Sequence, residues 1–343
     1  MRIFDRCCKE YDKATSKKQF LIIIVIGALM LTSPALHAQD FLQKAKKFLD
    51  AGECEKAKLA YEAYKVENPG GDAGVEQRMD ECWKKFDGQP CPGTPTVTDY
   101  DGHTYNTVRI GKQCWMKENL RTKHYANGTE ISFSDLDTST TIGYYSWPNH
   151  NIGFVEKYGY LYNWKALMGN SSSSNANPSG VQGICPAGWH VPSKAEWIQL
   201  DEYVSSQSKY VCGSDNKNKA KALASVSSQW SLYDTLKTWK DWAGKWEVES
   251  HYKGAVGNCD VISNQGINNE TGFSALPAGS FDPYPYRRYY SFGYSADFWS
   301  TTESSNYPTT NAFSYGFCSL SSSIFIGFYG LKIDYISVRC VRD

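Results

Sequence analysis

The chain has 343 residues, 41% of them apolar, which is enough for one large globular domain or for a large domain and a small one. Its 36 basic residues are balanced by 36 acidic residues. Binding to a nucleic-acid backbone needs a basic surface, so this balance argues against a nucleic-acid partner.

The N-terminus resembles a secretory signal peptide. Lys17 and Lys18 precede an apolar run from Phe20 to Leu31, and small residues follow up to Ala38. We expect residues 1–38 to be the signal peptide, with cleavage after Ala38. The alternative is an uncleaved membrane anchor, although the run is shorter than the roughly 20 apolar residues of a spanning helix. That segment is the only membrane contact we expect.

Removal of residues 1–38 would leave 30 basic and 33 acidic residues, a net charge of −3. Nine cysteines would remain, and in an exported chain they indicate disulfides rather than thiol chemistry. Because nine is odd, one cysteine stays free or pairs outside the chain. The sequence has no Cys-x-x-Cys or His-x-x-x-His pair, so we expect neither a structural zinc site nor any cofactor.

Residues 39–86 are predicted to form a small helical module. Ala45, Phe48, Leu49, Ala57 and Ala60 have the spacing of a single tetratricopeptide-like helix pair, with small residues where the helices touch. A third helix from Val75 to Phe86 should close the module. One repeat cannot bury its own face, so the module is either a docking surface for a partner or a spacer left from a longer array.

Residues 87–97 are rich in proline and glycine and are predicted to be a linker. A strand follows from Tyr105 to Ile110. Asp99 and Asp101 could start a calcium loop, but the later oxygen ligands of such a loop do not follow. We therefore interpret Asp101-Gly102 as a hairpin turn into the strand.

The next elements are a strand in residues 111–120 and a short helix in residues 159–168. After Trp189 and His190, the spacing of Ser193 and Glu196 is that of a capping box, which predicts a helix start. Apolar residues at helical spacing give this helix one buried face. They are Trp197, Leu200, Tyr203 and Val204.

Another short helix is predicted in residues 218–226, followed by an inserted loop region from Trp230 to Cys259. Strands are predicted at 273–281, 297–303, 312–317, 323–329 and 335–341. Many short strands with few helices and long Ser/Gly/Asn loops indicate an α+β fold for residues 98–343.

Six ordered motifs resemble the Fibrobacter succinogenes major paralogous domain family over about residues 92–343. They are Thr98-Asp-Tyr-Asp-Gly-His-x-Tyr105, Ile110-Gly-x-x-Cys-Trp-Met-x-Glu-Asn-Leu120, Tyr158-Gly-x-Leu-Tyr-Asn-Trp164, Cys185-Pro-x-Gly-Trp-His-Val-Pro192, Phe298-Trp-Ser300 and Ser337-Val-Arg-Cys-Val-Arg342. The family consists of exported, often surface-associated bacterial proteins of unestablished activity. The resemblance implies a C-type-lectin-like fold, also related to sulfatase-modifying factors, with small antiparallel sheets, two to three helices and long loops.

Two chemistries of these distant relatives do not carry over. The Glu-Pro-Asn or Gln-Pro-Asp loop and the Trp-Asn-Asp strand of calcium-dependent lectins are absent from the sequence. The formylglycine-generating enzymes need a cysteine pair before the last strand, where this chain has Cys318 alone. Cys318 is therefore the expected free cysteine, with the properties of a small buried apolar residue.

The other eight cysteines are predicted to pair within the chain. Two pairs should close the helical module and the inserted loop region, and two should tie motifs to the sheet. The expected pairs are Cys54–Cys82, Cys212–Cys259, Cys91–Cys114 and Cys185–Cys340. A bridge between Cys318 and Cys340 would contradict this scheme.

No catalytic constellation is recognised. His190 has no partner at triad spacing in its motif, and Glu196 is assigned to the helix cap, so we interpret His190 as structural. Paired carboxylates cannot be judged without the fold, which leaves Asp282, Asp297 and Glu303 as candidates.

The binding hypothesis rests on aromatic residues. Residues 281–343 contain 17 Phe, Trp and Tyr among 63 residues, and flat rings stack on sugar faces. We predict a non-enzymatic exported protein, in the cell envelope or outside the cell, that binds glycans or cell-surface proteins. The alternative is a secreted enzyme acting on glycans or envelope material. The predicted ligand residues are Tyr284, Tyr286, Arg287, Tyr289, Tyr290 and Trp299.

Overall fold

The computed structural model describes residues 34–134, 137–226, 229–231, 239–240, 246–247, 259–283 and 288–343. The chain divides into two compact units, one ending at Lys85 and the other running from Phe86 to Asp343.

The described part of the first unit contains three helices, as predicted: α3 (Pro34–Asp50), α4 (Cys54–Glu67) and α5 (Ala73–Lys84). Helix α3 begins upstream of the expected cleavage point after Ala38. The buried alanines Ala45, Ala57 and Ala60 allow α3 and α4 to pack closely. Helix α5 begins where the Asp72 carboxylate accepts a hydrogen bond from the backbone N–H of Val75.

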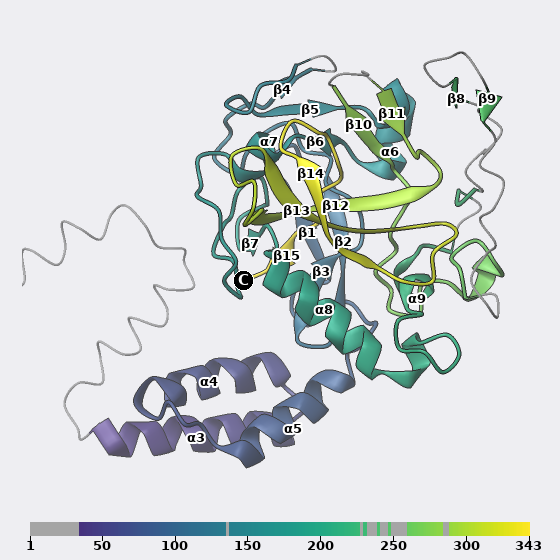
Figure 1. The fold of residues 1–343 in the computed structure, drawn as a ribbon. Coiled ribbons are helices and arrows are strands. Elements are labelled where there is room, and N and C mark those ends of the chain that lie inside the picture. The colour runs from purple at the N-terminus through teal and green to yellow at the C-terminus, as the bar shows by residue number, and fades with distance from the viewer. Residues whose placement is uncertain are drawn as a thin grey trace, which may run out of the picture. The chain divides into compact units, whose positions relative to one another are not determined.

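The largest sheet of the second unit joins the two ends of that unit (Figure 1). Its strand order is β1-β2-β3-β15-β7, and its neighbouring strands are antiparallel. Early and final segments therefore share one sheet. The strands are β1 (Thr96–Thr98), β2 (Thr104–Ile110), β3 (Gln113–Met116), β15 (Val341–Arg342) and β7 (Trp189–His190).

The same unit contains smaller sheets. Two of them have three strands, and only their β4–β5 pair is parallel among the described strands. They consist of β12 (Ser295–Glu303), β13 (Asn311–Cys318) and β14 (Phe325–Leu331), and of β4 (Ser132–Phe133), β5 (Tyr144–Ser146) and β6 (Leu161–Tyr162). The two-stranded pairs are β10 (Ser280–Asp282) with β11 (Arg288–Tyr290), and β8 (Trp239–Lys240) with β9 (Trp246–Glu247).

The helices of this unit are short apart from one. They are α6 (Val155–Tyr158), α7 (Trp164–Met168), α8 (Lys194–Ser206), α9 (Ala220–Leu223) and the 3-10 turns η2 (Pro148–His150), η3 (Ile152–Phe154), η4 (Ser208–Tyr210) and η6 (Gln265–Ile267). Both hydrogen bonds of the predicted capping box are present at the start of α8. The predicted α+β composition is confirmed.

Helix α8 packs its buried face on the β12–β13–β14 sheet. Trp197 stacks on Tyr315 with ring centroids 4.4 Å apart and touches Trp115 at 4.5 Å. Arg339 is fully buried nearby and donates to the backbone carbonyls of Met116 and Phe273. The buried charge is thereby given the hydrogen-bond partners that burial requires.

Several boundaries differ from the sequence prediction. Residues 87–97 are not a free linker, because Gly88 and Gln89 exchange backbone hydrogen bonds with Arg109, and β1 starts at Thr96. Residues 159–168 begin as strand β6 and become helix α7 only after Asn163 caps it. The strand predicted at 273–281 is reduced to β10. Most of the inserted loop region from 230 to 259 lies outside the described residues.

All four predicted disulfides are present: Cys54–Cys82, Cys91–Cys114, Cys185–Cys340 and Cys212–Cys259. Cys318 is free, as predicted, but it is partly exposed rather than buried. The Cys185–Cys340 bridge spans 155 residues and ties the segment before β7 to the segment before β15.

Candidate ligand surface

A row of aromatic rings lies on the surface formed by β4, β5, η2 and β11, hereafter the aromatic row. Phe133 and Trp147 form its first pair, with ring centroids 4.5 Å apart. Phe133 is 39% exposed, and Trp147 is half-buried. The rings are neighbours because β4 and β5 pair in register, with Phe133 opposite Tyr145.

The row continues through His150 to Tyr289. The ring centroids are 6.2 Å apart between Trp147 and His150, and 5.8 Å apart between His150 and Tyr289. Asn149 and His150 both have positive φ, 48° and 54°. This backbone conformation is uncommon for residues with side chains, and the surrounding structure must hold it.

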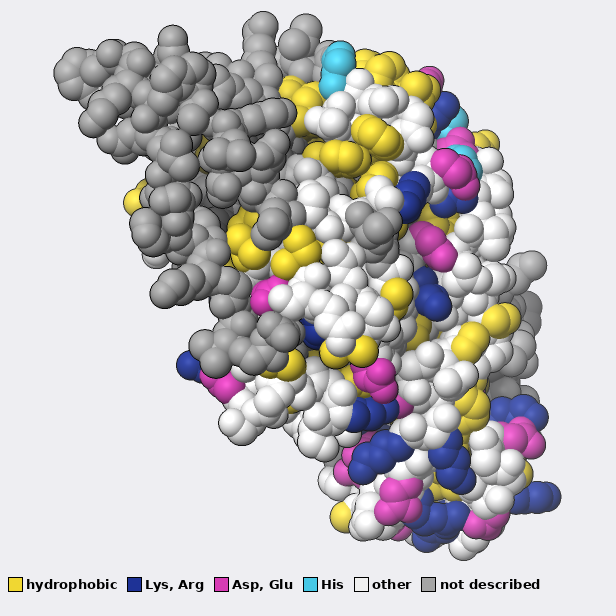
Figure 2. All heavy atoms as spheres, turned by 90° about the vertical axis from the view of Figure 1, so that its right-hand side faces the viewer, with side chains coloured by type: hydrophobic (Ala, Val, Ile, Leu, Met, Phe, Trp, Pro, Cys, Tyr) yellow, Lys and Arg dark blue, Asp and Glu magenta, His cyan; other side chains and the backbone are white. Residues whose placement is uncertain are grey.

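The Tyr289 ring packs on buried aromatic residues. Its ring stacks on Phe281 at 4.5 Å, its direct partner in the β10–β11 pair, and Phe281 in turn contacts Tyr335. The Tyr289 hydroxyl lies 2.7 Å from the Ser146 hydroxyl on β5. This bond joins the β4–β5–β6 sheet to β11, so the rings are held in a fixed relation. Figure 2 shows hydrophobic side chains gathered near the top of one face, with a histidine among them.

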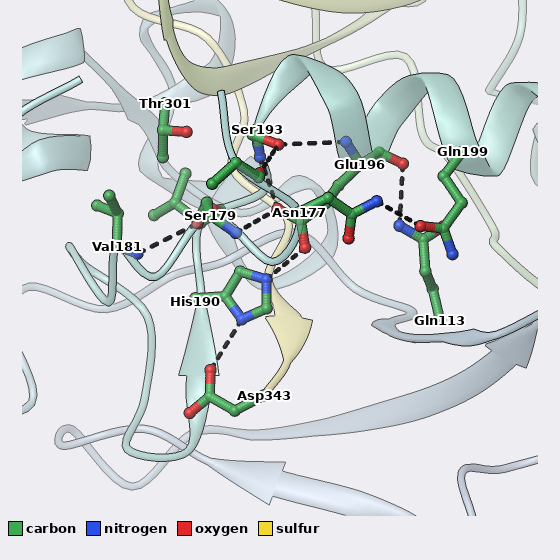
Figure 3. A network of polar contacts seen from close by, with 12 residues as sticks. Gln113, Asn177, Ser179, Val181, His190, Ser193, Glu196, Gln199, Thr301 and Asp343 are labelled. Carbon is green, nitrogen blue, oxygen red and sulfur yellow. Dashed lines mark hydrogen bonds and ion pairs between the residues drawn. The ribbon is translucent and has the colours of Figure 1, made fainter. Parts of the chain in front are cut away.

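The described polar groups also form a buried network around His190 (Figure 3). Its Nε2 lies 2.6 Å from Oε1 of Glu196, and its Nδ1 lies 2.8 Å from Oδ1 of Asp343. The other Glu196 oxygen accepts from the backbone N–H groups of Ser193 and Ser179. The cap therefore occupies only one oxygen of Glu196, so the prediction that Glu196 serves the helix cap alone is wrong.

Burial lowers the pKa of His190, but the hydrogen bonds and charges of Asp343 and Glu196 outweigh it and raise that pKa to about 9. At neutral pH the ring is then a cation that donates from both nitrogens and has no lone pair for proton abstraction. Its side chain is only 3% exposed. The geometry is that of a structural clamp between β7, α8 and Asp343, in agreement with the predicted structural role.

Comparison with known protein families adds an independent observation. The family model of the Fibrobacter succinogenes major domain matches residues 108–342. The chain belongs to this family. No curated protein and no solved structure matches the chain. The match begins within β2, so the hairpin loop between β1 and β2 precedes the matched part of the Fibrobacter succinogenes major domain.

The motif residues of the Fibrobacter succinogenes major domain build the interior of this unit. Asn119 donates to the Tyr158 carbonyl and accepts from Arg339. Trp197 donates its indole N–H to the Trp299 carbonyl, and Trp299 donates its own to the Tyr162 carbonyl. These contacts join segments that are far apart in the sequence into one frame.

The predicted ligand residues have different positions. Tyr289 lies in the aromatic row, and Tyr290 lies on β11. Tyr284, Tyr286 and Arg287 lie outside the described residues. Trp299 is fully buried in the core, so its prediction as a ligand residue is wrong.

Sequence reasoning missed Phe133, Trp147 and His150. Trp147 had one signal, its spacing of two residues from Tyr145, which places both rings on one side of a strand. Phe133 and His150 had none. Nothing in the sequence shows that Tyr289 joins them.

The candidate carboxylates are dispersed. Glu303 forms an ion pair with Lys332 at 2.5 Å. Burial raises the pKa of Asp297 to about 6, although the Ser295 hydroxyl donates to this carboxylate and lowers it. A more distinctive group is Asp334, whose pKa burial raises to about 7, with a further contribution from the charge of Asp282 and an opposing one from the Leu331 N–H.

Proposed function

We propose that the protein is an exported, non-enzymatic binding protein whose aromatic row recognises glycans on a cell surface or in extracellular material. The observation that supports this most is the continuous contact from Phe133 through Trp147 and His150 to Tyr289. Adjacent rings at such spacings offer successive stacking faces to an extended chain of sugar rings.

The polar groups within the row suit the same ligand. A pyranose has apolar C–H faces and hydroxyl groups around its edge, and rings with a polar group serve both. Tyr289 presents a hydroxyl beside Ser146, and His150 presents ring nitrogens. Because Tyr289 is braced by Phe281, little side-chain entropy is lost when a ligand binds, which favours affinity.

The proposed fold is a C-type-lectin-like domain. It is supported by the pairing of β15 with both β3 and β7, which joins the ends of the unit, and by the Cys185–Cys340 bridge beside that pairing. For the first unit we propose a single tetratricopeptide-like helix pair, α3 and α4, closed by α5. Its proposed role is a docking element or a spacer.

The disulfides support export. Four disulfides indicate an oxidising, extracytoplasmic environment. None of the helices in the described ranges is both long and apolar enough to span a membrane. The proposal keeps residues 1–38 as a signal peptide, which N-terminal sequencing of the exported protein would test by finding Gln39 first.

The binding proposal is tested with a glycan array probed by the purified mature protein, followed by titration of the best glycan. We expect Trp147→Ala to weaken binding about tenfold, the equivalent of about 1.4 kcal/mol, because the central ring is lost. Phe133→Ala, which truncates a more exposed ring, should weaken binding by a smaller factor. The matched control is Tyr307→Ala, since Tyr307 is 65% exposed and belongs to none of the ring contacts of the row. Equal affinity in all three variants, or no binding to any glycan, would contradict the proposal.

A secreted enzyme is the second candidate, and Asp334 favours it. One of its oxygens, Oδ1, is buried without a hydrogen-bond partner among the described residues, and a carboxylic acid with a pKa near 7 can act as a general acid. The next residue, Tyr335, packs on Phe281 beneath the aromatic row. Release of reducing ends from the bound glycan, lost in Asp334→Asn while binding persists, would support the enzyme over the binding protein.

A further inference from the structure

The hairpin loop between β1 and β2 brings three metal-ligating side chains together. One ligand atom from each of Asp99, Asp101 and His103 lies within 4.8 Å of the other two. The loop is short because Thr98 pairs directly with Thr104, and Gly102 supplies its positive φ of 84°. The side chains of alternate loop residues therefore converge on one side of the turn.

A distant segment adds a second imidazole. His124 lies 23 residues after Asp101, and its Nδ1 is 2.5 Å from Oδ1 of that carboxylate. The ring of Tyr100 covers His124 with centroids 5.4 Å apart. The combination is two carboxylates, each in contact with one imidazole, because His103 Nδ1 is 3.1 Å from Oδ2 of Asp99. This mixed donor set differs from an ordinary group of surface acids.

Both carboxylates are oriented by further hydrogen bonds. Asp99 accepts from the Tyr105 hydroxyl at 2.6 Å and from the His103 backbone N–H at 2.9 Å. Asp101 accepts from the Thr122 hydroxyl and from the backbone N–H of Lys123. Outer contacts of this kind fix metal ligands in place and increase their affinity.

The cluster is open to solvent on one side. The Asp99 side chain is 2% exposed, whereas those of Asp101, His103 and His124 are 17%, 33% and 28% exposed. An ion can therefore reach the cluster, while its base stays rigid.

The charged residues around the cluster are of both signs. Burial raises the pKa of Asp101, but hydrogen bonds from Lys123, Thr122 and His124 outweigh it and hold the pKa below its usual value. Arg121 lies over the Tyr105 ring at 5.3 Å and pairs with Glu156, so part of its charge is compensated. Glu130 is the bridge partner of His124 on the neighbouring segment.

We propose that Asp99, Asp101 and His103 bind a Zn²⁺ ion. His124 is placed to serve as a fourth ligand or to orient Asp101. Imidazole nitrogen with carboxylate oxygen is a donor set that Zn²⁺ accepts, whereas Ca²⁺ prefers six or more oxygens. Ligand atoms of tetrahedral zinc lie about 3.4 Å apart, so the separation must close by at most about 1.4 Å. A coordinating imidazole binds the ion through a ring nitrogen that carries no proton.

The test uses the mature protein with intact disulfides and no affinity tag, treated with EDTA and dialysed, then titrated with Zn²⁺ by calorimetry. We expect one equivalent of Zn²⁺ to bind. His103→Gln should weaken binding at least tenfold, and Thr122→Val, which removes an outer contact, should weaken it by about tenfold. His150→Gln is the matched control, because His150 is an exposed histidine that lies in the aromatic row. The affinity of this variant for Zn²⁺ should be unchanged.

The free thiol Cys318 also attracts zinc, so the titration is repeated in Cys318→Ser, in which the stoichiometry should remain one. Co²⁺ gives a second readout, since tetrahedral nitrogen and oxygen coordination produces visible absorption that His103→Gln should abolish. Near-unchanged circular dichroism of His103→Gln ensures that lost binding is not lost folding. Equal affinity in His103→Gln and His150→Gln, or zinc binding that disappears only in Cys318→Ser, would overturn the proposal.

Discussion

The second unit contains two groups in which histidines contact carboxylates. Their comparison shows that the burial of the side chains decides whether such a contact stabilises the fold or is open to a ligand. His190 is held between Glu196 and Asp343, and the His190 and Glu196 side chains are 3% and 2% exposed. His103 and His124 lie beside Asp99 and Asp101. The two rings are 33% and 28% exposed, although the Asp99 side chain is only 2% exposed. The hydrogen-bond distances overlap, so distance alone does not separate the two groups.

The difference is in what the surroundings allow. Around His190 an ion pair is weakly screened and strongly coupled to folding, because loss of one member leaves the other charged and buried. Around His124 water reaches both the ring and the Asp101 carboxylate and screens this pair, which therefore contributes little stability. The Asp99 carboxylate beside His103 is buried, but the His103 ring is open to solvent. The first group is suited to holding the chain, and the second to binding.

The largest expected effect comes from breaking the buried group. His190→Ala leaves Glu196 without its imidazolium partner, and we expect a loss of about 3–5 kcal/mol in the free energy of unfolding. Urea denaturation measures this as a lower midpoint at constant slope. If the loss is no larger than that in His103→Ala, burial does not distinguish the two groups.

The pH dependence of stability should be the next largest effect. The pKa of His190 is about 9 in the folded state and about 6.5 unfolded, so its stabilisation is complete below pH 6.5 and is lost as pH rises through 9. We expect a loss of about 2 kcal/mol between pH 7.5 and 9.5. The window lies above the raised pKa values of Asp297 and Asp334.

The control for this pH effect is His190→Leu, which cannot titrate. Its unfolding free energy should lose far less than that of the wild type over the same window. A parallel decline in both proteins would assign the pH effect to other groups.

Local patterns explain which parts could be predicted from the sequence. Ser193 and Glu196 are three residues apart, so their capping box follows from helix geometry alone. The hairpin turn at Asp101 and Gly102 is equally local. The Cys54–Cys82 disulfide was predictable because both cysteines lie in the helical module, and Cys212–Cys259 because a bridge there closes the inserted loop region.

The contacts that matter for function are long-range. His190 and Asp343 are 153 residues apart, and Ser146 and Tyr289 are 143 apart. Trp299 shows the complementary error: most of β12 is buried on both of its faces, so aromatic density there indicates core packing rather than a ligand surface. Neither periodicity nor motif spacing carries this information.

A smaller effect is expected where Tyr105 supports Asp99 in the group of His103 and His124. Tyr105→Phe removes the hydroxyl that donates to Asp99 and accepts from the Arg121 N–H, and we expect a loss of about 1–2 kcal/mol in stability. Zinc affinity should fall with it, because Asp99 is less firmly oriented. A loss of stability with no change in zinc affinity would show that Asp99 is not a ligand.

The smallest effect is expected for His124→Gln. The ring is partly exposed, and an exposed pair with a carboxylate contributes about 0–1 kcal/mol, so thermal unfolding should hardly change. The affinity for Zn²⁺ should change more than the stability does. We expect the affinity to fall tenfold or more if His124 is a ligand, and by less if His124 only orients Asp101. If the histidine–carboxylate group is exposed and binds metal, His124→Gln should leave the stability nearly unchanged and weaken metal binding. Marked destabilisation by His124→Gln would instead place this group with the buried clamp at His190.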